Sequence, residues 1–439
     1  MGLEESIPGA EDRCTVQTET PLFSLSDFYF LLSPFPYCLP YEFIIQRLEP
    51  FRHAAGLSTP RALIRMKTIL LISSLLLTLP LKAATQLDQV LPIRGLCISA
   101  PRPSEVDAFS RFIQEELAPR FVNTLILRVD FNYQFTNQAE LGNPSGLSRT
   151  DVQKCVDVCR TNHIRLIPQI NLLGHQSWQR STGKLLSAHP EFDETPWVKT
   201  PEKYAWPNPD GLYCRSYCPL HPKVHDVVLP LVDEICEAFE ADAFHAGMDE
   251  VFYIGESQCP RCGGKNKAEL FAGEVKLLRD HLQASHRQLW IWGDRLLDGK
   301  VTGLGEWEAS INGTQGAIDL IPRDVVICDW HYQRADPTAA YFAVKGLPVV
   351  TCPWNNGKAA LAQLQDTTRF RAQSPGVMKD RFLGVMQTVW SDAGGFMRDF
   401  YGYREDKEYK SGQKTAAKCF LQLFDEIRVL NESSDVKTK

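Results

Sequence analysis

Two adjacent acidic residues, Asp249 and Glu250, follow an apolar run within residues 244–254, which read FHAGMDEVFYI. This pattern predicts a buried strand that delivers both carboxyl groups at its C-terminal end. Carboxylates held in one site repel each other, so we expect at least one to have a raised pKa and to hold a proton near neutral pH. A proton donor beside a charge stabiliser suits the cleavage of a glycosidic bond. A solvated acidic pair at the start of a loop is the alternative interpretation.

Eight short apolar runs alternate with helical patterns from residue 91 onward. Such alternation over roughly 300 residues is typical of a (β/α)8 TIM barrel of the α/β class, whose active site lies at the C-terminal ends of the strands. An open doubly wound sheet is the competing architecture, but no glycine-rich phosphate loop follows the first strand. The predicted strands are residues 93–99, 124–129, 165–170, 243–248, 289–292, 325–328, 347–351 and 382–387. The predicted helices are residues 104–117, 149–162, 223–239, 266–285 and 358–370.

The composition argues against a nucleic-acid partner. Of the 439 residues, 44% are hydrophobic and 23% are charged, which is ordinary for a globular protein with a sizeable core. The formal net charge is -6 and no run of lysine or arginine occurs, so we expect no nucleic-acid partner. A neutral substrate fits this balance better than a polyanion.

The segment after Met66 has the form of a secretory signal peptide. Met66 and Lys67 precede an apolar stretch at residues 68–79, and Ala83 fits a cleavage site. The stretch is too short for a comfortable membrane span. We therefore predict a signal peptide at residues 66–83 and an exported protein, periplasmic or secreted, with no membrane association after cleavage.

Residues 1–65 precede this signal peptide, which is an unusual arrangement. Our hypothesis is that they are a non-native or disordered extension with no fold of their own, and a genuine small N-terminal segment is the alternative. The barrel is expected to occupy residues 91–430, with an amphipathic helix near residues 415–430 closing its outer layer. Residues 431–439 are expected to form a disordered tail.

Cysteines form two close pairs in the middle of the chain. Thirteen cysteines are present, and the eleven from Cys97 onward follow the predicted cleavage site, so an odd number remains and not all can pair. Cys259 and Cys262 have C-x-x-C spacing, and Cys214 and Cys218 form a second pair upstream. These four thiols could hold a structural zinc ion, form disulfides in an oxidising compartment, or remain free. None of these states would be catalytic.

Tryptophans recur where the later strands end. Sugar rings present apolar C–H faces that stack on aromatic rings, so a group of tryptophans at a barrel mouth suits a pyranose pocket. For any single tryptophan, packing in the core is the alternative. The long connection at residues 172–220 holds further tryptophans, including Trp206, and is expected to shape a substrate groove. The tryptophans at or just beyond strand ends are Trp292, Trp307, Trp330, Trp354 and Trp390.

From residue 94 to about residue 392 the sequence resembles glycoside hydrolase family 20, the β-N-acetylhexosaminidases. Residues 245–250, HAGMDE, are similar to that family's H-x-G-x-D-E signature. The resemblance implies that Glu250 is the general acid/base and that Asp249 orients the substrate's 2-acetamido group, which itself attacks the anomeric carbon. It implies an exo-acting, retaining enzyme that needs no metal or organic cofactor. Its partner would be an oligosaccharide or glycoconjugate containing N-acetylhexosamine.

Other positions match the family in the same order. Arg94 resembles the arginine that binds sugar hydroxyls, because its fork of donors could bridge two of them. Asp130 and His175 resemble a relay behind Glu250 that tunes its proton affinity. His245 is expected to order the strand end by hydrogen bonding rather than to touch substrate.

The resemblance also assigns a sugar pocket. Trp292, Trp330 and Trp390 would form the walls around the acetamide group. Tyr332 is a candidate for the hydroxyl that holds the acetamide carbonyl, and Asp392 for a carboxylate that binds a sugar hydroxyl.

The chain departs from the family pattern at the third strand. Residues 168–175 read PQINLLGH, so Gln169, Asn171 and Leu173 replace two acids and a proline. Asp130 is followed by Phe131 rather than by a second aspartate, and no separate N-terminal α/β domain fits before residue 91. These changes leave Asp249 and Glu250 intact. The properties that they put in question are the preferred glycosidic linkage and the binding of sugar hydroxyls.

Two alternatives to a substrate-assisted hexosaminidase remain. A barrel glycosidase with a protein nucleophile would need a second acid from another strand, about 5 Å from the proton donor. A catalytically inactive carbohydrate-binding barrel is the non-enzymatic alternative, since a fold does not establish activity.

Overall fold

The computed structural model describes residues 85–178, 181–199, 214–406 and 415–436. The chain divides into two units, Met1–Lys82 and Ala83–Lys439, and every described residue belongs to the second. The predicted extension at residues 1–65, the predicted signal peptide at residues 66–83 and Trp206 therefore lie outside the described residues.

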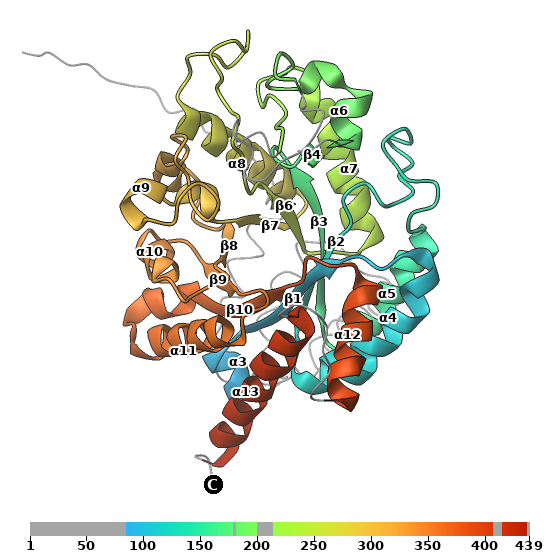
Figure 1. Cartoon of the computed structure of the whole chain (residues 1–439), viewed down its shortest axis with the longest axis vertical. Coiled ribbons are helices and arrows are strands. Elements are labelled where there is room, and N and C mark those ends of the chain that lie inside the picture. The colour runs from blue at the N-terminus through green and yellow to red at the C-terminus, as the bar shows by residue number, and fades with distance from the viewer. Residues whose placement is uncertain (1–84, 179–180, 200–213, 407–414, 437–439) are drawn as a thin grey trace, which may run out of the picture. The chain divides into compact units, whose positions relative to one another are not determined.

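Eight parallel strands close into a barrel, seen in Figure 1 as the ring of arrows inside the helices. The first strand pairs with both the second and the last, which closes the ring. Each strand begins and ends within two residues of a predicted apolar run, and the predicted (β/α)8 barrel is confirmed. In order around the barrel the strands are β1 (Ile93–Ser99), β2 (Thr124–Arg128), β3 (Arg165–Leu172), β6 (Ala243–Gly247), β7 (Gln288–Trp292), β8 (Val326–Trp330), β9 (Val349–Cys352) and β10 (Phe382–Thr388).

The strands are apolar on both faces because both faces are covered. In β2, Ile126 points into the barrel, whereas Leu125 and Leu127 belong to the core between strands and helices. Strands buried in this way read as continuous apolar runs, which is why the sequence located them so closely. The interior also contains large rings, with Trp290 and Trp292 fully buried.

Helices cover the outside of the barrel between most strands (Figure 1). Side-chain caps set several of their starts: Ser148 and Asp151 form a capping box before α5, and Asn266 caps α8. The connection from β7 to β8 holds only short turns, η6 (Asp294–Leu296), α9 (Gly299–Thr302) and η7 (Gln315–Asp319). The longer covering helices are α4 (Val106–Phe112), α5 (Arg149–Thr161), α7 (Val224–Ala238), α8 (Lys267–Ala284), α10 (Thr338–Val344), α11 (Gly357–Gln373), α12 (Ala393–Glu405) and α13 (Ala416–Val436).

The structure corrects the predicted helices in three places. The predicted helix 104–117 is divided into a 3-10 turn, η2 (Pro103–Glu105), the helix α4 and a π-helical turn, η3 (Ile113–Leu117). Helix α12 was not predicted. Helix α13 continues to Val436, so the expectation of a disordered tail from residue 431 is wrong up to that point.

Three connections at the C-terminal ends of the strands carry the polar residues of interest. The connection from β3 to α7 contains a two-stranded hairpin, β4 (Ser177–Trp178) and β5 (Ser181–Thr182), and the short helix α6 (Lys184–Ala188). The connections from β6 to α8 and from β7 to β8 are irregular. Within the described part of the chain, no helix combines the length and apolarity needed to cross a membrane.

Candidate active site

Asp249 and Glu250 lie at the C-terminal end of β6, as the sequence predicted. The turn that presents them needs unusual backbone: Gly247, Met248 and Glu250 all have positive φ, of 67°, 67° and 49°. A Cβ atom at Gly247 would lie 1.9 Å from the side-chain oxygen of Asn171 on β3, so this position requires glycine. The close approach of β3 and β6 fixes where the two acids point.

Left-handed backbone is concentrated at this end of the barrel. Nine described non-glycine residues have positive φ, and four of them follow helix ends, where that conformation is common. The other five lie just beyond β2, β3 and β6. Such conformations cost free energy and persist where the surrounding structure enforces them, often at functional sites. These five residues are Asp130, Leu173, His175, Met248 and Glu250.

His175 joins the two acids. Its Nε2 atom lies 3.1 Å from Oδ2 of Asp249 and 3.2 Å from Oε2 of Glu250. Its Nδ1 atom faces the sulfur of Cys214 at 3.1 Å. Gly174 keeps this loop close to the acids, because a Cβ there would lie 2.6 Å from the carbonyl oxygen of Asp249.

The three titratable groups have opposed pKa shifts. Burial disfavours charge on His175, but Asp249 and Cys214 together outweigh it and raise the His175 pKa well above its ordinary value. Burial also opposes ionisation of Asp249, yet His175 leaves the Asp249 pKa below its ordinary value. For Glu250, burial is the largest effect and raises the pKa, with Asp249 and Asp294 acting in the same direction. The opposed shifts make Glu250 the weaker acid of the two, so a proton on the pair resides preferentially on Glu250 and Asp249 ionises first.

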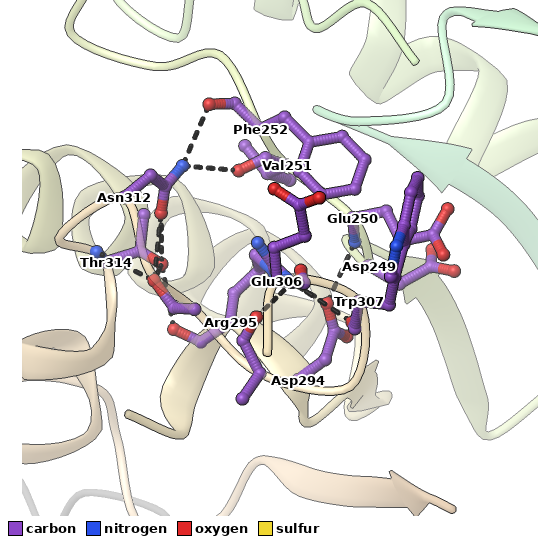
Figure 2. A network of polar contacts seen from close by, with 12 residues as sticks. Asp249, Glu250, Val251, Phe252, Asp294, Arg295, Glu306, Trp307, Asn312 and Thr314 are labelled. Atoms are coloured by element: carbon purple, nitrogen blue, oxygen red, sulfur yellow. Dashed lines mark hydrogen bonds and ion pairs between the residues drawn. The ribbon is translucent and has the colours of Figure 1, made fainter. Parts of the chain in front are cut away.

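A buried carboxylate below the pair supports Glu250. Oδ2 of Asp294 accepts hydrogen bonds from the backbone N–H of Glu250 at 2.9 Å and from Nε of Arg295 at 2.7 Å, and Figure 2 shows both lines. Oδ1 of Asp294 accepts from the indole of Trp330 at 3.2 Å. The sequence analysis missed Asp294 and Arg295. Their signal is a charged pair at positions 294–295, directly after the apolar end of β7.

The loop after β7 holds the loop after β6 in place (Figure 2). The side-chain amide of Asn312 donates to the carbonyl oxygens of Val251 and Phe252, at 2.8 and 2.9 Å. Nη2 of Arg295 donates to the carbonyl oxygens of residues 306, 307 and 309, which orders the loop from the other side. Glu250 is therefore positioned by packed backbone on both sides.

The predicted tryptophans meet at the barrel mouth. Trp390 lies 5.9 Å from Trp292 between ring centroids and donates its indole N–H to the Tyr332 hydroxyl at 3.0 Å. Tyr332 stacks on Trp330 at 5.0 Å and meets Trp354 edge-on at 5.4 Å. Trp390, Tyr332 and Trp354 are half-buried, whereas Trp292 and Trp330 are buried beneath them. Asp249 and Glu250 lie close enough to Tyr332 to raise its pKa in addition to the effect of burial.

Arg94 does not belong to this site. It is the second residue of β1 and so lies at the N-terminal end of the barrel, opposite the acids. Its guanidinium donates to the carbonyl oxygens of Leu91 and Phe121 and pairs with Asp88 at 2.9 Å. The prediction that Arg94 binds sugar hydroxyls is wrong for this geometry, because β1 continues five residues beyond it.

Arg128 is the arginine that the structure places at the mouth. It ends β2, and its Cζ lies 4.6 Å from the centroid of the Trp390 ring. Nη2 donates to the Ser99 hydroxyl and to the carbonyl oxygen of Val389, at 2.7 and 2.9 Å. Its buried Nε has no hydrogen-bond partner among the described residues. The signal in the sequence is an arginine that interrupts the apolar run LILRV.

The predicted relay of Asp130 and His175 takes a different form. Oδ1 of Asp130 accepts the backbone N–H of Asn171 at 2.9 Å, which joins β2 to β3. Cys214 occupies the space facing Nδ1 of His175, so a thiol replaces the expected aspartate there. Asp130 still acts on His175 through its charge at longer range.

His245 and Asp392 occupy opposite environments. His245 is fully buried, accepts the backbone N–H of Gly247 at Nδ1 over 3.0 Å and packs against Trp292, which is the ordering role considered from the sequence. Asp392 caps α12 through the backbone N–H of Gly395, and its side chain is 56% exposed. It reaches the same end of the barrel as the acids, 3.6 Å from Arg102, with its carboxylate in solvent.

The four cysteines named as a zinc candidate do not meet as one group. Cys214 contacts His175 and lies 3.9 Å from Oε2 of Glu250. Cys218, Cys259 and Cys262 cluster elsewhere, with Glu194 as the fourth group. The prediction is therefore corrected at Cys214, because the chain turns between Cys214 and Cys218 and sends their sulfurs to different sites.

Comparison with known proteins decides the family. The profile of the glycosyl hydrolase family 20 catalytic domain matches residues 129–393, more than half of the chain. The chain belongs to this family. Its matched region begins at the end of β2 and ends at the start of α12, so it includes the acidic pair, His175 and the aromatic residues described above.

Individual relatives are distant. A lacto-N-biosidase of Bifidobacterium bifidum is 24% identical over 214 residues, which are 46% of this chain and 17% of that protein. A β-N-acetylhexosaminidase from Bacteroides fragilis NCTC 9343 is 16% identical, with a TM-score of 0.51 over 79% of this chain and 72% of that one. A chitobiase of Flavobacterium johnsoniae is also 16% identical, with a TM-score of 0.50 over 78% and 52% of the two chains. At these identities the solved structures support the shared barrel fold.

Proposed function

We propose that this family 20 barrel is an exo-acting β-N-acetylhexosaminidase that removes terminal N-acetylhexosamine residues by a retaining, substrate-assisted mechanism. The observation that carries the proposal is the contact of His175 with both Asp249 and Glu250, where the Asp249 pKa is lowered and the Glu250 pKa is raised. The relatives named as a β-N-acetylhexosaminidase and a chitobiase agree with a substrate of this class.

Glu250 is suited to donate the first proton. Its side chain is 14% exposed, so it reaches the mouth while most of its surface is removed from water. The raised pKa lets Glu250 hold its proton to higher pH than an ordinary glutamic acid, and a glycosidic oxygen needs that proton as its bond to the anomeric carbon breaks.

Asp249 is suited to hold the acetamide group. Its Oδ2 faces His175, whereas Oδ1 is buried and has no partner from another residue in the described part of the chain. A buried carboxylate oxygen without a donor is costly, and an amide N–H of the substrate would satisfy it. The same oxygen would stabilise the positive charge that develops on the acetamide nitrogen.

The reaction then proceeds in two steps. The acetamide carbonyl oxygen attacks the anomeric carbon while the bond to the leaving oxygen breaks, and that oxygen takes the Glu250 proton. The product of this step is a cyclic oxazolinium ion bound beside the Asp249 carboxylate. Water then attacks the anomeric carbon from the original face and gives a proton to Glu250, while the bond from that carbon to the acetamide oxygen breaks and restores the acetamide, so the configuration is retained.

A protein nucleophile finds less support at this site. Asp130 follows β2 and Asp294 follows β7, but each carboxylate already accepts a backbone hydrogen bond. Asp294 also accepts from Arg295 and Trp330 and is 2% exposed, which removes it from a sugar ring.

Two substrates and one inhibitor test the mechanism on the purified chain. A chromogenic GlcNAc glycoside should be hydrolysed, the corresponding glucoside should be almost inert because it lacks the internal nucleophile, and a thiazoline mimic of the intermediate should inhibit far more tightly than GlcNAc. Equal rates on glucoside and GlcNAc glycoside, or a covalent adduct trapped on a carboxylate by a fluorinated sugar, would defeat the mechanism. No hydrolysis of any of them would favour the carbohydrate-binding alternative.

We also propose that the protein is exported, on the strength of the signal-like segment at residues 66–83. N-terminal sequencing of the protein made in its own cells should find a mature end just after Ala83. A mature end upstream of Met66 would contradict both the signal peptide and the idea that residues 1–65 are a non-native extension.

A further inference from the structure

Three thiols and one carboxylate meet between two loops at the C-terminal side of the barrel. Glu194 and Cys218 come from the connection between β3 and α7, and Cys259 and Cys262 from the connection between β6 and α8. Their ligand atoms lie within 4.8 Å of one another. The four side chains are at most 4% exposed, so the group is closed to solvent.

We propose that Glu194, Cys218, Cys259 and Cys262 bind one structural zinc ion. The sulfur of Cys218 lies 3.6 Å from that of Cys259 and 3.8 Å from that of Cys262. Zinc bonds sulfur at about 2.3 Å in a tetrahedron, whose S···S edge is about 3.8 Å, so these sulfurs already have the spacing of zinc ligands. Thiolates favour zinc over magnesium or calcium, and four protein ligands leave no open position for catalysis.

Backbone pairing brings Glu194 beside Cys218. Asp193 and Tyr217 form an antiparallel bridge, and the Glu194 N–H donates to the carbonyl oxygen of Ser216 at 3.0 Å. The Cys218 N–H donates to the carbonyl oxygen of Phe192 at 2.7 Å. These bonds fix two ligands from positions 24 residues apart in the sequence, a pairing that cysteine spacing alone does not indicate.

The other two ligands lie on a tight turn. The Gly263 N–H donates to the carbonyl oxygen of Cys259 at 3.0 Å, and a Cβ at Gly263 would lie 2.6 Å from that oxygen. This turn places the sulfurs of Cys259 and Cys262 3.6 and 3.8 Å from that of Cys218.

The ionic balance also fits a dication. Without metal, the Cys262 thiol lies 2.8 and 2.9 Å from the two carboxylate oxygens of Glu194, to which it donates its proton. Zinc binding would release the three thiol protons to solvent and leave three thiolates and one carboxylate around the ion. The resulting complex carries a net charge of about -2. Nε of Arg261, 3.5 Å from the Cys218 sulfur, offsets part of it.

A disulfide accounts for this group less well. A disulfide joins two sulfurs, so it would leave the third thiol and the buried Glu194 carboxylate outside the bond, with Glu194 still accepting the backbone N–H of Glu256. Every cysteine among the described residues is free, including these three. The four-ligand set uses all of the polar groups that face one another, and it is independent of the proposed glycosidase activity.

The first experiment measures metal. The full chain, expressed with zinc and freed of loose metal by gel filtration, should contain about one zinc ion per chain by atomic emission. Cys262→Ser and Glu194→Ala should lose the ion, because each removes a direct ligand, whereas Glu194→Cys should keep it by completing a four-cysteine set. Cys155→Ala is the matched control, since Cys155 is a buried free cysteine on α5.

A second group of possible metal ligands allows the location of the zinc ion to be tested. His175, Cys214 and Glu250 also face one another closely enough to bind a cation. Zinc that is lost from Cys214→Ala but retained in Cys262→Ser would place the ion there and overturn the proposal. A metal-free wild-type chain in which a disulfide links two of the three thiols by mass spectrometry would overturn it as well.

Measurements on the wild-type chain cover the case in which the ligand variants do not fold. A mercurial thiol reagent should release about one zinc ion per chain, detected with a chromogenic chelator. Removing zinc should lower the melting temperature by several degrees, and adding zinc back should restore it, because an ion that binds only the folded state stabilises that state. Cobalt substitution should give the charge-transfer absorption of a tetrahedral thiolate site. Absence of zinc release and of that absorption would contradict the proposal.

Discussion

Asp249 and Glu250 are neighbours in the chain but differ in the charges around them. His175 contacts both carboxyl groups, yet Asp249 also lies near His245, whereas Glu250 lies near Asp294. Burial and the additional negative charge raise the Glu250 pKa, and the positive charge of His175 lowers that of Asp249. One pair of residues thereby obtains an acid and a carboxylate at the same pH.

Glu250→Gln should remove turnover of substrates with poor leaving groups and leave the fold intact. Glutamine matches the shape of the side chain but has no proton to give, and general acid catalysis contributes about 100- to 10,000-fold. Rates on a natural disaccharide and melting temperature should be measured together, with Glu269→Gln on the exposed face of α8 as the control. A near wild-type rate for Glu250→Gln would remove this residue from the mechanism.

His175→Gln should move both limbs of the pH–rate profile to higher pH. The proposed mechanism needs Asp249 ionised and Glu250 protonated, and the positive charge of His175 holds both pKa values down. Without that charge the acidic limb, set by Asp249, and the basic limb, set by Glu250, both rise. The profile of kcat/KM decides the matter: a slower enzyme with unmoved limbs would mean that His175 acts only by position.

Single residues were predicted correctly where a sequence motif identified them. They were predicted poorly where the assignment depended on which end of a strand the residue occupies. HAGMDE located the acids because their place follows from the strand that precedes them. Arg94 was assigned by its order in the sequence, but it stands at the start of β1, and Arg128 at the end of β2 is the arginine that meets Trp390. Glu194 and Cys214 could not be assigned, because irregular loops set their positions.

Tryptophans in and just beyond the barrel strands differ in how far they support the fold and how far they face the candidate site. Trp290 is fully buried inside the barrel, whereas Trp390 follows β10 and is half-buried beside Tyr332 and Arg128. Trp390→Ala should therefore weaken binding and turnover more than folding. Trp290→Ala is the matched comparison and should cost about 3–5 kcal/mol of stability. Melting temperature and kinetics on both variants test this, and similar stability losses from the two would make Trp390 a core residue.

His331, in the turn directly after β8, is a buried histidine whose charge stabilises the fold. Burial by itself lowers the His331 pKa, but Asp329 and Glu308 outweigh it and raise the pKa to about 10. Because the folded pKa exceeds the unfolded value of about 6.5, this contribution is fully present below pH 6.5 and is lost as the pH rises towards 10. His331→Gln should flatten the fall in unfolding free energy across that window, which urea titrations at several pH values would measure. Parallel curves for the two proteins would refute the assignment.

The sequence predicted strands more closely than helices for a physical reason. Parallel strands buried on both faces leave continuous apolar runs, as at residues 382–387 in β10. Helix α12 was missed because Gly394 and Gly395 lie in its first turn and Gly402 near its end, which lowers helix propensity. Packing of Phe396 and Phe400 against α13 overrides that propensity.

At the scale of the whole molecule, the barrel closes only when its first and last strands meet. β1 pairs with β10, almost 300 residues later in the sequence, so every intervening element must be in place before the ring is complete. Helix α13 reinforces this closure. The side-chain amide of Gln387 on β10 donates to the carbonyl oxygen of Ala416 at the start of α13, at 2.7 Å, and to that of Trp354 at 2.8 Å.

Removal of α13 should therefore unfold the whole barrel rather than leave a shorter chain that is still folded. Phe420, Leu423, Phe424 and Ile427 are fully buried, and α13 packs against α11, α12 and the short helix α3 (Gln86–Val90). A chain that ends at Asp406 should lose its cooperative melting transition and its activity together.

Phe424→Ala should lower stability by about 3–5 kcal/mol but leave kcat/KM unchanged well below its melting temperature, because Phe424 does not reach the site.

Lys418→Ala on the exposed face of α13 is the control, and its effect should stay within about 0.5 kcal/mol. Calorimetry and activity measured on the same samples separate two outcomes. A single transition that shifts as a whole in Phe424→Ala fits one cooperative barrel, whose ends are joined through β1, β10 and α13. An active chain ending at Asp406, or two separate transitions in Phe424→Ala, would mean that α13 is an appendage and that the strand pairs alone close the barrel.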